Sequence, residues 1–375
     1  MLVLILECQS AALMFFLTLN VDLVRKTTDN TTLASIKLTR GSFVVNILTL
    51  HYWVSFAGAL LLLLFSGLMM TSLGVLHWWD VVHFINLYRF THITHLKLNF
   101  ICILIVLGLM LKIGAFPFHF WKPELVRNLS LPAVFLYSTP YAATIIFAAT
   151  IVLCYMMYAA PTTIIIAIWL LSIAAIYVFA TILIQLTEMK VFLAYTSGLH
   201  MLYICLALVA DKTPGALAWA YCIIYIMSTL TMFTGLLSFR RCSIKYLSDI
   251  QILTHVPAMI FWFSAALATM AGVPPLAGFW VKFITLARLW KAGEFVLTIH
   301  LLCVSMIFMY FYLALYRFMG ATNVKFDVQR TLLVKSQTII NIGIFTAILH
   351  ICGVWYMCDI LNLTTLLSNY VYGNL

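Results

Sequence analysis

Residues 99–124 read NFICILIVLGLMLKIGAFPFHFWKPE, an apolar run with a lysine near its end and helix-disturbing residues directly after it. The run 99–116 is long enough to cross a bilayer as a helix. A lysine near the bilayer centre costs roughly 2.5–3.5 kcal/mol on insertion scales, so Lys112 is seldom there by accident. Gly114 and Pro117 follow it closely. A buried cation beside a broken helix is typical of an ion or proton path in a membrane protein.

A second apolar run combines the same two features. Residues 272–279 read GVPPLAGF and lead into Lys282. Pro274 and Pro275 each remove a backbone donor and disfavour helix at the residue before them. In lipid, carbonyls freed in this way must find partners within protein or in a water-lined cavity. We therefore expect a helix break at Pro274, Pro275 and Gly278 beside a hydrated pocket, the alternative being a structural kink with a snorkelling lysine.

The composition excludes a soluble domain. Hydrophobic residues make up 65% of the 375 residues, charged residues make up 9%, and the mean hydropathy is +1.09. A soluble fold of this length needs far more polar surface, so the sequence predicts an all-α polytopic membrane protein. The formal net charge is +10, but the cations are spread over loops and no basic stripe indicates nucleic acid. The nine cysteines have no metal-ligand spacing and no metal site is expected.

We expect about ten membrane spans. The loops that follow odd-numbered spans carry fourteen Lys and Arg residues, against five in the loops that follow even-numbered spans. The positive-inside rule therefore places the first set on the matrix or cytoplasmic side and both termini on the opposite side. The expected spans cover residues 2–20, 42–68, 99–116, 132–157, 162–186, 192–210, 215–238, 256–286 (interrupted), 295–319 and 336–357.

Three side chains within the apolar runs are candidates for proton chemistry. Desolvation lets a buried lysine trade a proton, and a charged Lys112 then needs a carboxylate partner. Glu7 is the acid that lies well inside an apolar run, although its spacing from Lys112 cannot show that the two touch. Each has an alternative reading, as a residue at the membrane interface. His200 suits a proton relay by its unperturbed pKa, or is a hydrogen-bonded packing residue.

Motifs for redox or nucleotide chemistry are absent from the sequence. It contains no G-x-G-x-x-G, no P-loop, no iron–sulfur cysteine set and no haem-attachment motif. We therefore expect this chain to move an ion rather than to oxidise a substrate.

The motifs together resemble those of the antiporter-like membrane subunits of respiratory complex I, NADH:ubiquinone oxidoreductase. The stretch 112–124 is similar to the K-x-G-x-x-P-F-H-x-W-x-P-[ED] signature that these subunits share. Within the group, the order of the motifs resembles subunit 2, the counterpart of bacterial subunit N. The further stretches that carry this resemblance are 7–10 (ECQS), 34–37 (ASIK), 193–200 (LAYTSGLH), 225–233 and 272–282.

The resemblance implies a proton-translocating antiporter-like bundle. It pairs Glu7 with Lys112, places His200 on the hydrophilic axis, and assigns Lys282 to the broken helix of the exit half-channel. It also implies a multi-pass subunit of the mitochondrial inner membrane, in contact with lipids and with other membrane-arm subunits, especially neighbouring antiporter-like ones. FMN, iron–sulfur clusters and ubiquinone are expected on other subunits, with no cofactor on this chain.

Two departures from the family pattern stand out. The family has a central lysine in sequences like V-P-K-I, whereas this chain reads TPYA at 139–142, with Tyr141 in the lysine's place. A phenol can pass a proton along but cannot hold a positive charge, so the axis has one cation fewer. In addition, residues 1–375 correspond to a single domain of family helices 5–14. The first four helices are then lost or supplied by a separate chain.

Three functions therefore compete at this point. The leading one is a proton-conducting membrane-arm subunit of mitochondrial complex I. One alternative is a subunit of a multi-subunit cation/proton antiporter, because such proteins share the lysine–proline motifs. The other is a structural membrane-arm subunit with an impaired proton path, for which Tyr141 and the missing helices are the motive.

Overall fold

In the computed structural model the described residues are helical apart from turns and one isolated bridge, between Glu188 and Tyr246. The expected all-α fold class is thereby confirmed. The chain divides into two compact units, Met1–Ala174 and Ala175–Leu375, and each is described by itself. That residues 1–375 act as one domain stays a prediction. The structure describes residues 2–26, 34–74, 92–115, 117–159, 186–210, 215–237, 246–250, 257–274 and 276–320, with scattered positions between 166 and 183 and between 345 and 366.

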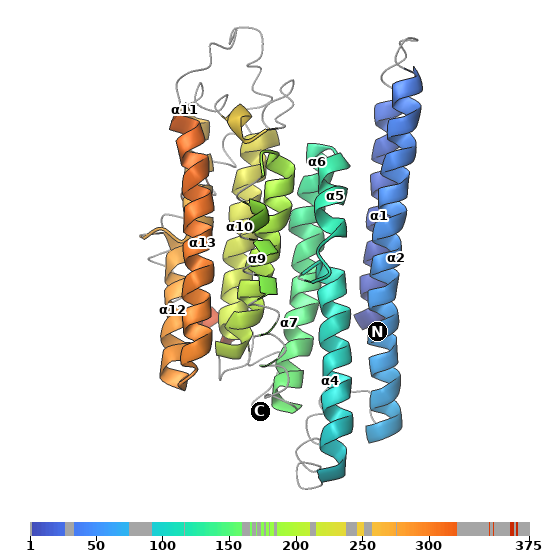
Figure 1. Cartoon of the computed structure of the whole chain (residues 1–375), viewed down its shortest axis with the longest axis vertical. Coiled ribbons are helices and arrows are strands. Elements are labelled where there is room, and N and C mark those ends of the chain that lie inside the picture. Colours follow the sequence, from blue (N-terminus) through green and yellow to red (C-terminus); the bar gives the residue numbers. More distant parts are fainter. Residues whose placement is uncertain are drawn as a thin grey trace. The chain divides into compact units, whose positions relative to one another are not determined.

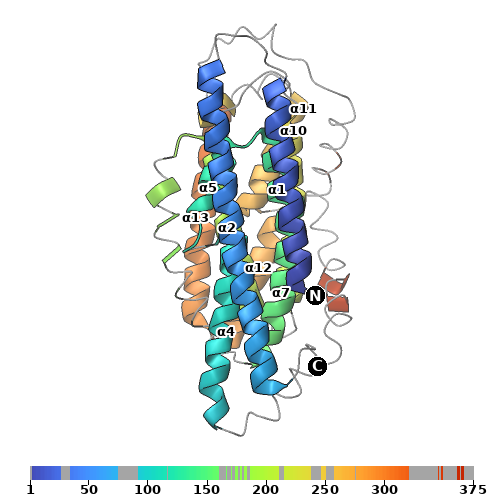
Figure 2. The ribbon, with the colours of Figure 1, turned by 90° about the vertical axis from the view of Figure 1, so that its right-hand side faces the viewer.

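The first unit is a set of long apolar helices with one short, more polar helix. The helix α2 packs along α4 and also contacts α1 and α5, while α4 contacts α7. Figures 1 and 2 both show α1 and α2 side by side. The glycine Gly74 ends α2 with a φ of +71°, a left-handed conformation that favours glycine. The elements are α1 (Leu2–Lys26), α2 (Ala34–Leu73), α4 (His92–Ile113), α5 (Trp121–Asn128), α6 (Leu131–Leu136), the π-helical turn η1 (Tyr137–Tyr141) and α7 (Ala142–Ala159).

The second unit is built around α9. In an 18-residue window of its span, Met189–Leu208, 94% of the residues are buried, so α9 is the central helix of this unit. The helix α10 contacts α9, α11 and α12, and α13 contacts the same three helices. Figure 1 shows α12 beside α13. The elements are α9 (Met189–Ala210), α10 (Ala216–Leu237), α11 (Pro257–Ala271), α12 (Ala277–Ala292) and α13 (Phe295–Gly320).

Eight of the ten expected spans coincide with apolar helices of the described residues. Five of these helices are long and apolar enough to cross a membrane, namely Val45–Thr71, Leu131–Leu153, Met189–Leu208, Ala216–Leu237 and Phe295–Arg317. Three are shorter, namely Val3–Phe15, Asn99–Ile113 and Phe261–Ala271. The expected spans 162–186 and 336–357 lie largely outside the described residues. The chain is thus a multi-pass membrane protein.

The predicted break in the span 256–286 is present. The helix α11 ends at Ala271 and α12 begins at Ala277, with Pro274 in the turn between them. Pro275 lies outside the described residues. A Cβ on Gly278 would stand 1.9 Å from the carbonyl oxygen of Thr269, so only glycine allows the two helices to approach so closely. The break therefore depends on small residues as well as on prolines.

Candidate functional site

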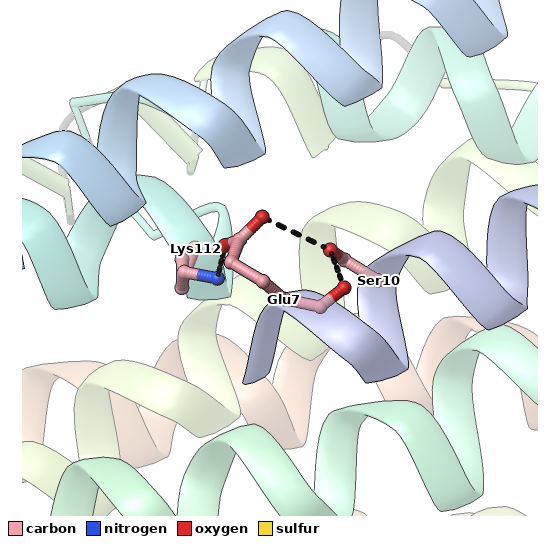
Figure 3. A network of polar contacts seen from close by, with 3 residues as sticks. All are labelled: Glu7, Ser10 and Lys112. Atoms are coloured by element: carbon pink, nitrogen blue, oxygen red, sulfur yellow. Dashed lines mark hydrogen bonds and ion pairs between the residues drawn. The ribbon is translucent and has the colours of Figure 1, made fainter. Parts of the chain in front are cut away.

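Glu7 and Lys112 form an ion pair within the first unit. Lys112, in the last turn of α4, donates from Nζ to Oε1 of Glu7 on α1. Figure 3 shows the two side chains pointing toward one another. Ser10, one turn further along α1, donates to the Glu7 backbone carbonyl at 2.8 Å and faces its second carboxylate oxygen at 3.4 Å. The Lys112 side chain is 1% exposed and that of Glu7 is 27% exposed, so the cation lies inward of the anion.

Two glycines bring α2 and α4 close enough to cover Lys112. A Cβ on Gly58 would stand 3.1 Å from both the Gly108 carbonyl oxygen and Cγ of Lys112. A Cβ on Gly108 would stand 3.2 Å from the Gly58 carbonyl oxygen. Beyond Lys112, Gly114 ends the helix with a φ of +66° and leaves room for Trp121. The lysine stem is therefore enclosed by backbone, and its amine lies within the unit rather than at its surface.

Tyr141 lies at the end of the π-helical turn, in the middle of the continuous helical stretch from α6 to α7. Pro140 lacks an N–H donor, and the turn widens here into a π-helix. The Tyr141 ring is buried, stacks on Tyr137 at 5.4 Å between ring centroids, and is within electrostatic reach of Glu7. A further hydrogen bond, from Gln9 to the Thr144 hydroxyl, ties α1 to α7 beside it. The first unit therefore places Tyr141 near the ion pair.

His200 is buried at the centre of the second unit. Its Nδ1 is 3.0 Å from the Tyr221 hydroxyl and its Nε2 is 3.0 Å from the Tyr312 hydroxyl. A neutral imidazole carries one N–H, so one phenol accepts a hydrogen bond from the ring while the other donates to it. The three groups form a short line of exchangeable protons across α9, α10 and α13. This arrangement suits a relay, and it equally satisfies a buried histidine.

Lys282 of α12 links the two sides of the helix break in the second unit by hydrogen bonds. Its Nζ donates to the carbonyl oxygens of Met270 at 2.8 Å and of Ala271 at 3.1 Å. These carbonyls belong to the last turn of α11, where a cation is stabilised by the helix dipole. Gly272 has a φ of +83°, and a Cβ there would stand 2.9 Å from Cδ of Lys282. The carbonyls that we expected to need a partner find one in the protein, while the expected hydrated pocket stays a prediction.

The Phe308 ring lies against both His200 and Lys282. It stacks on the imidazole at 4.3 Å between centroids, and the Lys282 ammonium is 4.3 Å from its centroid. A cation over an aromatic face is attracted by the ring quadrupole. The ring offers no group that can carry a proton, so proton exchange between His200 and Lys282 requires a route around it.

Sequence reasoning missed several polar residues of these two clusters. They are His51 of α2, Tyr221 of α10 and Tyr312 of α13, all buried. The available signal was that each of them stands inside an apolar run. A single polar aromatic residue in such a run is common, however, and only the packing brings these residues to the lysines and to His200.

The fold and the buried charges together define a multi-pass helical membrane protein that holds ionisable groups inside its helix bundles. A family model described as NADH:quinone oxidoreductase/Mrp antiporter, TM, matches residues 36–308. The chain belongs to this family. The resemblance to subunit 2 and subunit N that the motifs indicate is confirmed by the relatives.

Two relatives illustrate how far the similarity extends. NADH-quinone oxidoreductase subunit N of Ruthia magnifica subsp. Calyptogena magnifica is 29% identical over 312 residues, which cover 79% of this chain and 64% of the relative. NADH-ubiquinone oxidoreductase chain 2 of Arabidopsis thaliana is 28% identical over 262 residues, which cover 69% of this chain and 51% of the relative. The chain thus spans between half and two thirds of the length of these relatives.

Solved structures share the fold at lower identity. A chain of respiratory complex I from Thermus thermophilus with bound aureothin is similar with a TM-score of 0.69 and 22% identity, covering 86% of this chain and 69% of the other. A chain of the Mrp complex from Dietzia sp. DQ12-45-1b is similar with a TM-score of 0.70 and 13% identity, covering 89% of this chain and 69% of the other. Both belong to multi-subunit membrane complexes.

Proposed function

We propose that this chain is a membrane-arm subunit of a proton-pumping NADH:quinone oxidoreductase, the counterpart of subunit N and of chain 2. In this role it contributes a proton path along buried ionisable groups and carries no redox site of its own. The relatives are subunits of NADH-quinone and NADH-ubiquinone oxidoreductases, which supports the proposal.

The ion pair between Glu7 and Lys112 is the observation that carries the proposal. A buried ammonium needs a facing anion, and removing one partner of a buried pair leaves an uncompensated charge that typically costs 3–5 kcal/mol. Neutralising Glu7 by a proton would leave Lys112 in this state. The uncompensated charge disappears when Lys112 releases its own proton. A proton arriving at the carboxylate can thus drive one away from the amine.

Lys282 is the second proton-binding group of the proposal. As an ammonium it donates to two carbonyls at the end of α11. As a neutral amine it still has two N–H donors, but the hydrogen bonds lose their charge assistance and the attraction to the helix C-terminus. A gain or loss of the proton therefore acts on the helix break itself. His200 with its two tyrosines supplies exchangeable protons in the same unit.

The test compares two lysines of one helix in the intact complex. Lys282→Met should lower the number of protons moved per electron in vesicles while the complex still assembles. Lys291→Met is the matched control, because Lys291 is exposed near the end of the same helix and should pump normally. Normal pumping by an assembled Lys282→Met complex would contradict the proposal.

Location, partners and cofactors follow from the same proposal. The chain 2 relatives favour the mitochondrial inner membrane, and the charge distribution favours termini on the intermembrane-space side. The partners are then lipids and other membrane-arm subunits. FMN, iron–sulfur clusters and ubiquinone would be held by other subunits.

An Mrp-type cation/proton antiporter is the second candidate, and the fold shared with the Dietzia Mrp complex favours it. Copurification decides between the two. A chain that purifies with a quinone-reducing complex belongs to an oxidoreductase, whereas a chain found in a complex free of iron–sulfur subunits belongs to an antiporter.

A structural subunit with an impaired path is the third candidate, and Tyr141 in place of the family's lysine favours it. Tyr141→Phe tests it, because the ring and its stacking on Tyr137 are kept while the hydroxyl is removed. Under the leading proposal the variant pumps fewer protons per electron. Unchanged pumping together with normal pumping by Lys282→Met would favour the structural role.

A further inference from the structure

His51 of α2 is a buried histidine whose ring nitrogens have no hydrogen-bond partner among the described residues. Its side chain is 1% exposed, and both Nδ1 and Nε2 are unpartnered. The indole Nε1 of Trp121, whose ring lies 4.6 Å from the imidazole centroid, is also buried and unpartnered in the described part of the chain. Three buried polar atoms without partners therefore gather at one point of the first unit.

The groups around this ring come from several elements. Tyr137 and Tyr141 of η1 present their rings edge-on to the imidazole, at 5.9 and 6.2 Å between centroids. Ser55, one turn along α2 from His51, has a buried hydroxyl without a hydrogen-bond partner among the described residues, and this hydroxyl lies near the Tyr141 phenol. The Lys112 charge on α4 acts on the imidazole, while the Glu7 charge on α1 acts on Tyr141. His51 thus stands near both the ion pair and Tyr141.

The energetics of this position are unfavourable for a group that only fills space. Each buried donor or acceptor left without a partner costs about 1–3 kcal/mol, and phenylalanine would keep the stacking without that cost. Buried polar groups of this kind are normally hydrogen-bonded to ordered water, which needs two to four polar partners. For one water, one imidazole nitrogen and the indole N–H supply two, while the other imidazole nitrogen points away and needs a water of its own. The position thus has the partners that a bridging water requires.

The neighbouring charge limits how many protons the site can hold. Two adjacent cations in a low-dielectric interior repel one another strongly, so an ammonium at Lys112 and an imidazolium at His51 exclude each other. When the Lys112 ammonium gives up its proton, the repulsion disappears and the lone pair of the imidazole can accept it. The lysine then becomes a neutral amine and the histidine an imidazolium, so one proton and one positive charge move together.

We propose that His51 is a proton-relay residue of the Glu7–Lys112 site, taking the Lys112 proton through bridging water and passing it on toward Tyr141 and Ser55. The proposal rests on the proposed function, because it adds a carrier to the same path. It assigns a role to a residue of α2 that none of the sequence motifs includes.

The experiment uses the intact complex in proton-tight vesicles and two substitutions of the same residue. His51→Phe keeps an aromatic ring on Trp121, and His51→Gln keeps a donor and an acceptor, but neither side chain can carry a proton. Both should slow coupled turnover about tenfold or more, as expected when a proton-transfer group is lost. Both should also remove an ionisation from the pH profile of turnover. His300→Gln is the control, because His300 contacts its own helix backbone on α13, and it should change neither.

The alternatives are separated by the pattern of results. Normal pumping and an unchanged pH profile in His51→Phe would show that the imidazole ring serves only for packing, and would overturn the inference. Normal pumping in His51→Gln alone would reduce it to hydrogen bonding and overturn it as well. If Lys112→Met loses pumping while both His51 variants keep it, only this inference fails. If all these variants and Lys282→Met pump normally, the proposed function itself fails. Complex content on native gels verifies assembly, and the Gln variant decides if the Phe variant does not assemble.

Discussion

Glu7→Gln is the substitution that isolates the charge of the ion pair at the scale of single residues. The glutamine keeps the size of the side chain but leaves the Lys112 ammonium, which is 1% exposed, without an anion. We expect a loss of about 1–3 kcal/mol in the free energy of unfolding, less than for a fully buried pair because Glu7 is 27% exposed. We also expect a lower ratio of protons to electrons. Denaturant unfolding and vesicle pumping measure the two effects.

The double variant Glu7→Gln/Lys112→Met separates stability from pumping. It removes both charges, so most of the lost stability should return, because no uncompensated charge remains buried. Pumping should not return, because the site then has no group to protonate. Recovery of pumping in the double variant would show that the pair has only a structural role.

Lys122 gives a pH-dependent prediction outside the membrane spans. It lies in α5 and is 6% exposed, and in the described part of the chain its amine makes one long hydrogen bond, of 3.5 Å, to the Ile113 carbonyl. Burial lowers the pKa of Lys122 from 10.5 to about 8. The unfolded chain therefore binds this proton more tightly than the folded protein, and stability rises with pH between about 8 and 10.5. Below pH 8 the folded protein carries the full energetic penalty of burying the Lys122 ammonium.

Lys122→Met should remove this penalty. The variant should be more stable than the parent below pH 8, by on the order of 3 kcal/mol given 1.36 kcal/mol per pKa unit. The difference should close as the pH passes from about 8 to 10.5, since the lysine is then neutral in both states. Unfolding curves at several pH values measure it, with Lys291→Met as the exposed control. A difference that is independent of pH would contradict the assignment.

The sequence predicts single residues unequally well. Lys112 and Glu7 stand out because charge in an apolar run is costly, and this alone predicts that they need partners. Their contact depends on the close approach of Gly58 and Gly108, which apolar sequence does not specify. The role of His51 could not be predicted from the sequence, because what a histidine in an apolar run can do depends on the groups that pack around it.

At the scale of elements, the two glycines that directly follow α11 and α12 give a matched pair. Gly272 follows α11, Gly293 follows α12, and both have a φ of +83°. A Cβ on Gly293 meets nothing within 4 Å, whereas one on Gly272 stands 2.9 Å from Lys282 Cδ and 3.1 Å from its Nζ. Gly293→Ala should therefore cost only the left-handed strain, on the order of 1 kcal/mol. Gly272→Ala should cost about 2–4 kcal/mol, because overpacking is added.

The consequence for function separates the two variants further. Gly272→Ala should displace the Lys282 amine from the Met270 and Ala271 carbonyls and lower pumping, while Gly293→Ala should leave pumping unchanged. Stability and pumping of the two variants in parallel measure this. Equal effects on pumping would mean that the position of the Lys282 amine at the helix break is not important.

The described elements were largely predictable, and the exceptions have local causes. Apolar length predicts where helices cross a bilayer, and the tandem prolines predict the break after α11. The π-helical turn at Tyr137–Tyr141 was not predictable. A proline inside a helix frees a carbonyl, and whether the chain kinks or widens depends on the rings that pack there, here Tyr137, Tyr141 and His51.

At the scale of the whole molecule, the charge count gives the final prediction, and α13 offers a direct test. Lys291 precedes this helix and Arg317 stands in its last turn, and both are exposed. The positive-inside rule predicts that the loops richer in Lys and Arg lie on the matrix side, and Arg317 belongs to that set while Lys291 does not. Lys291→Cys should therefore react with a membrane-impermeant maleimide from the intermembrane-space side, and Arg317→Cys from the matrix side. The parent chain, with its native cysteines, sets the background. If the two cysteines were labelled from the opposite sides, the chain would have the reverse orientation in the membrane. Its buried groups would then move protons in the opposite direction.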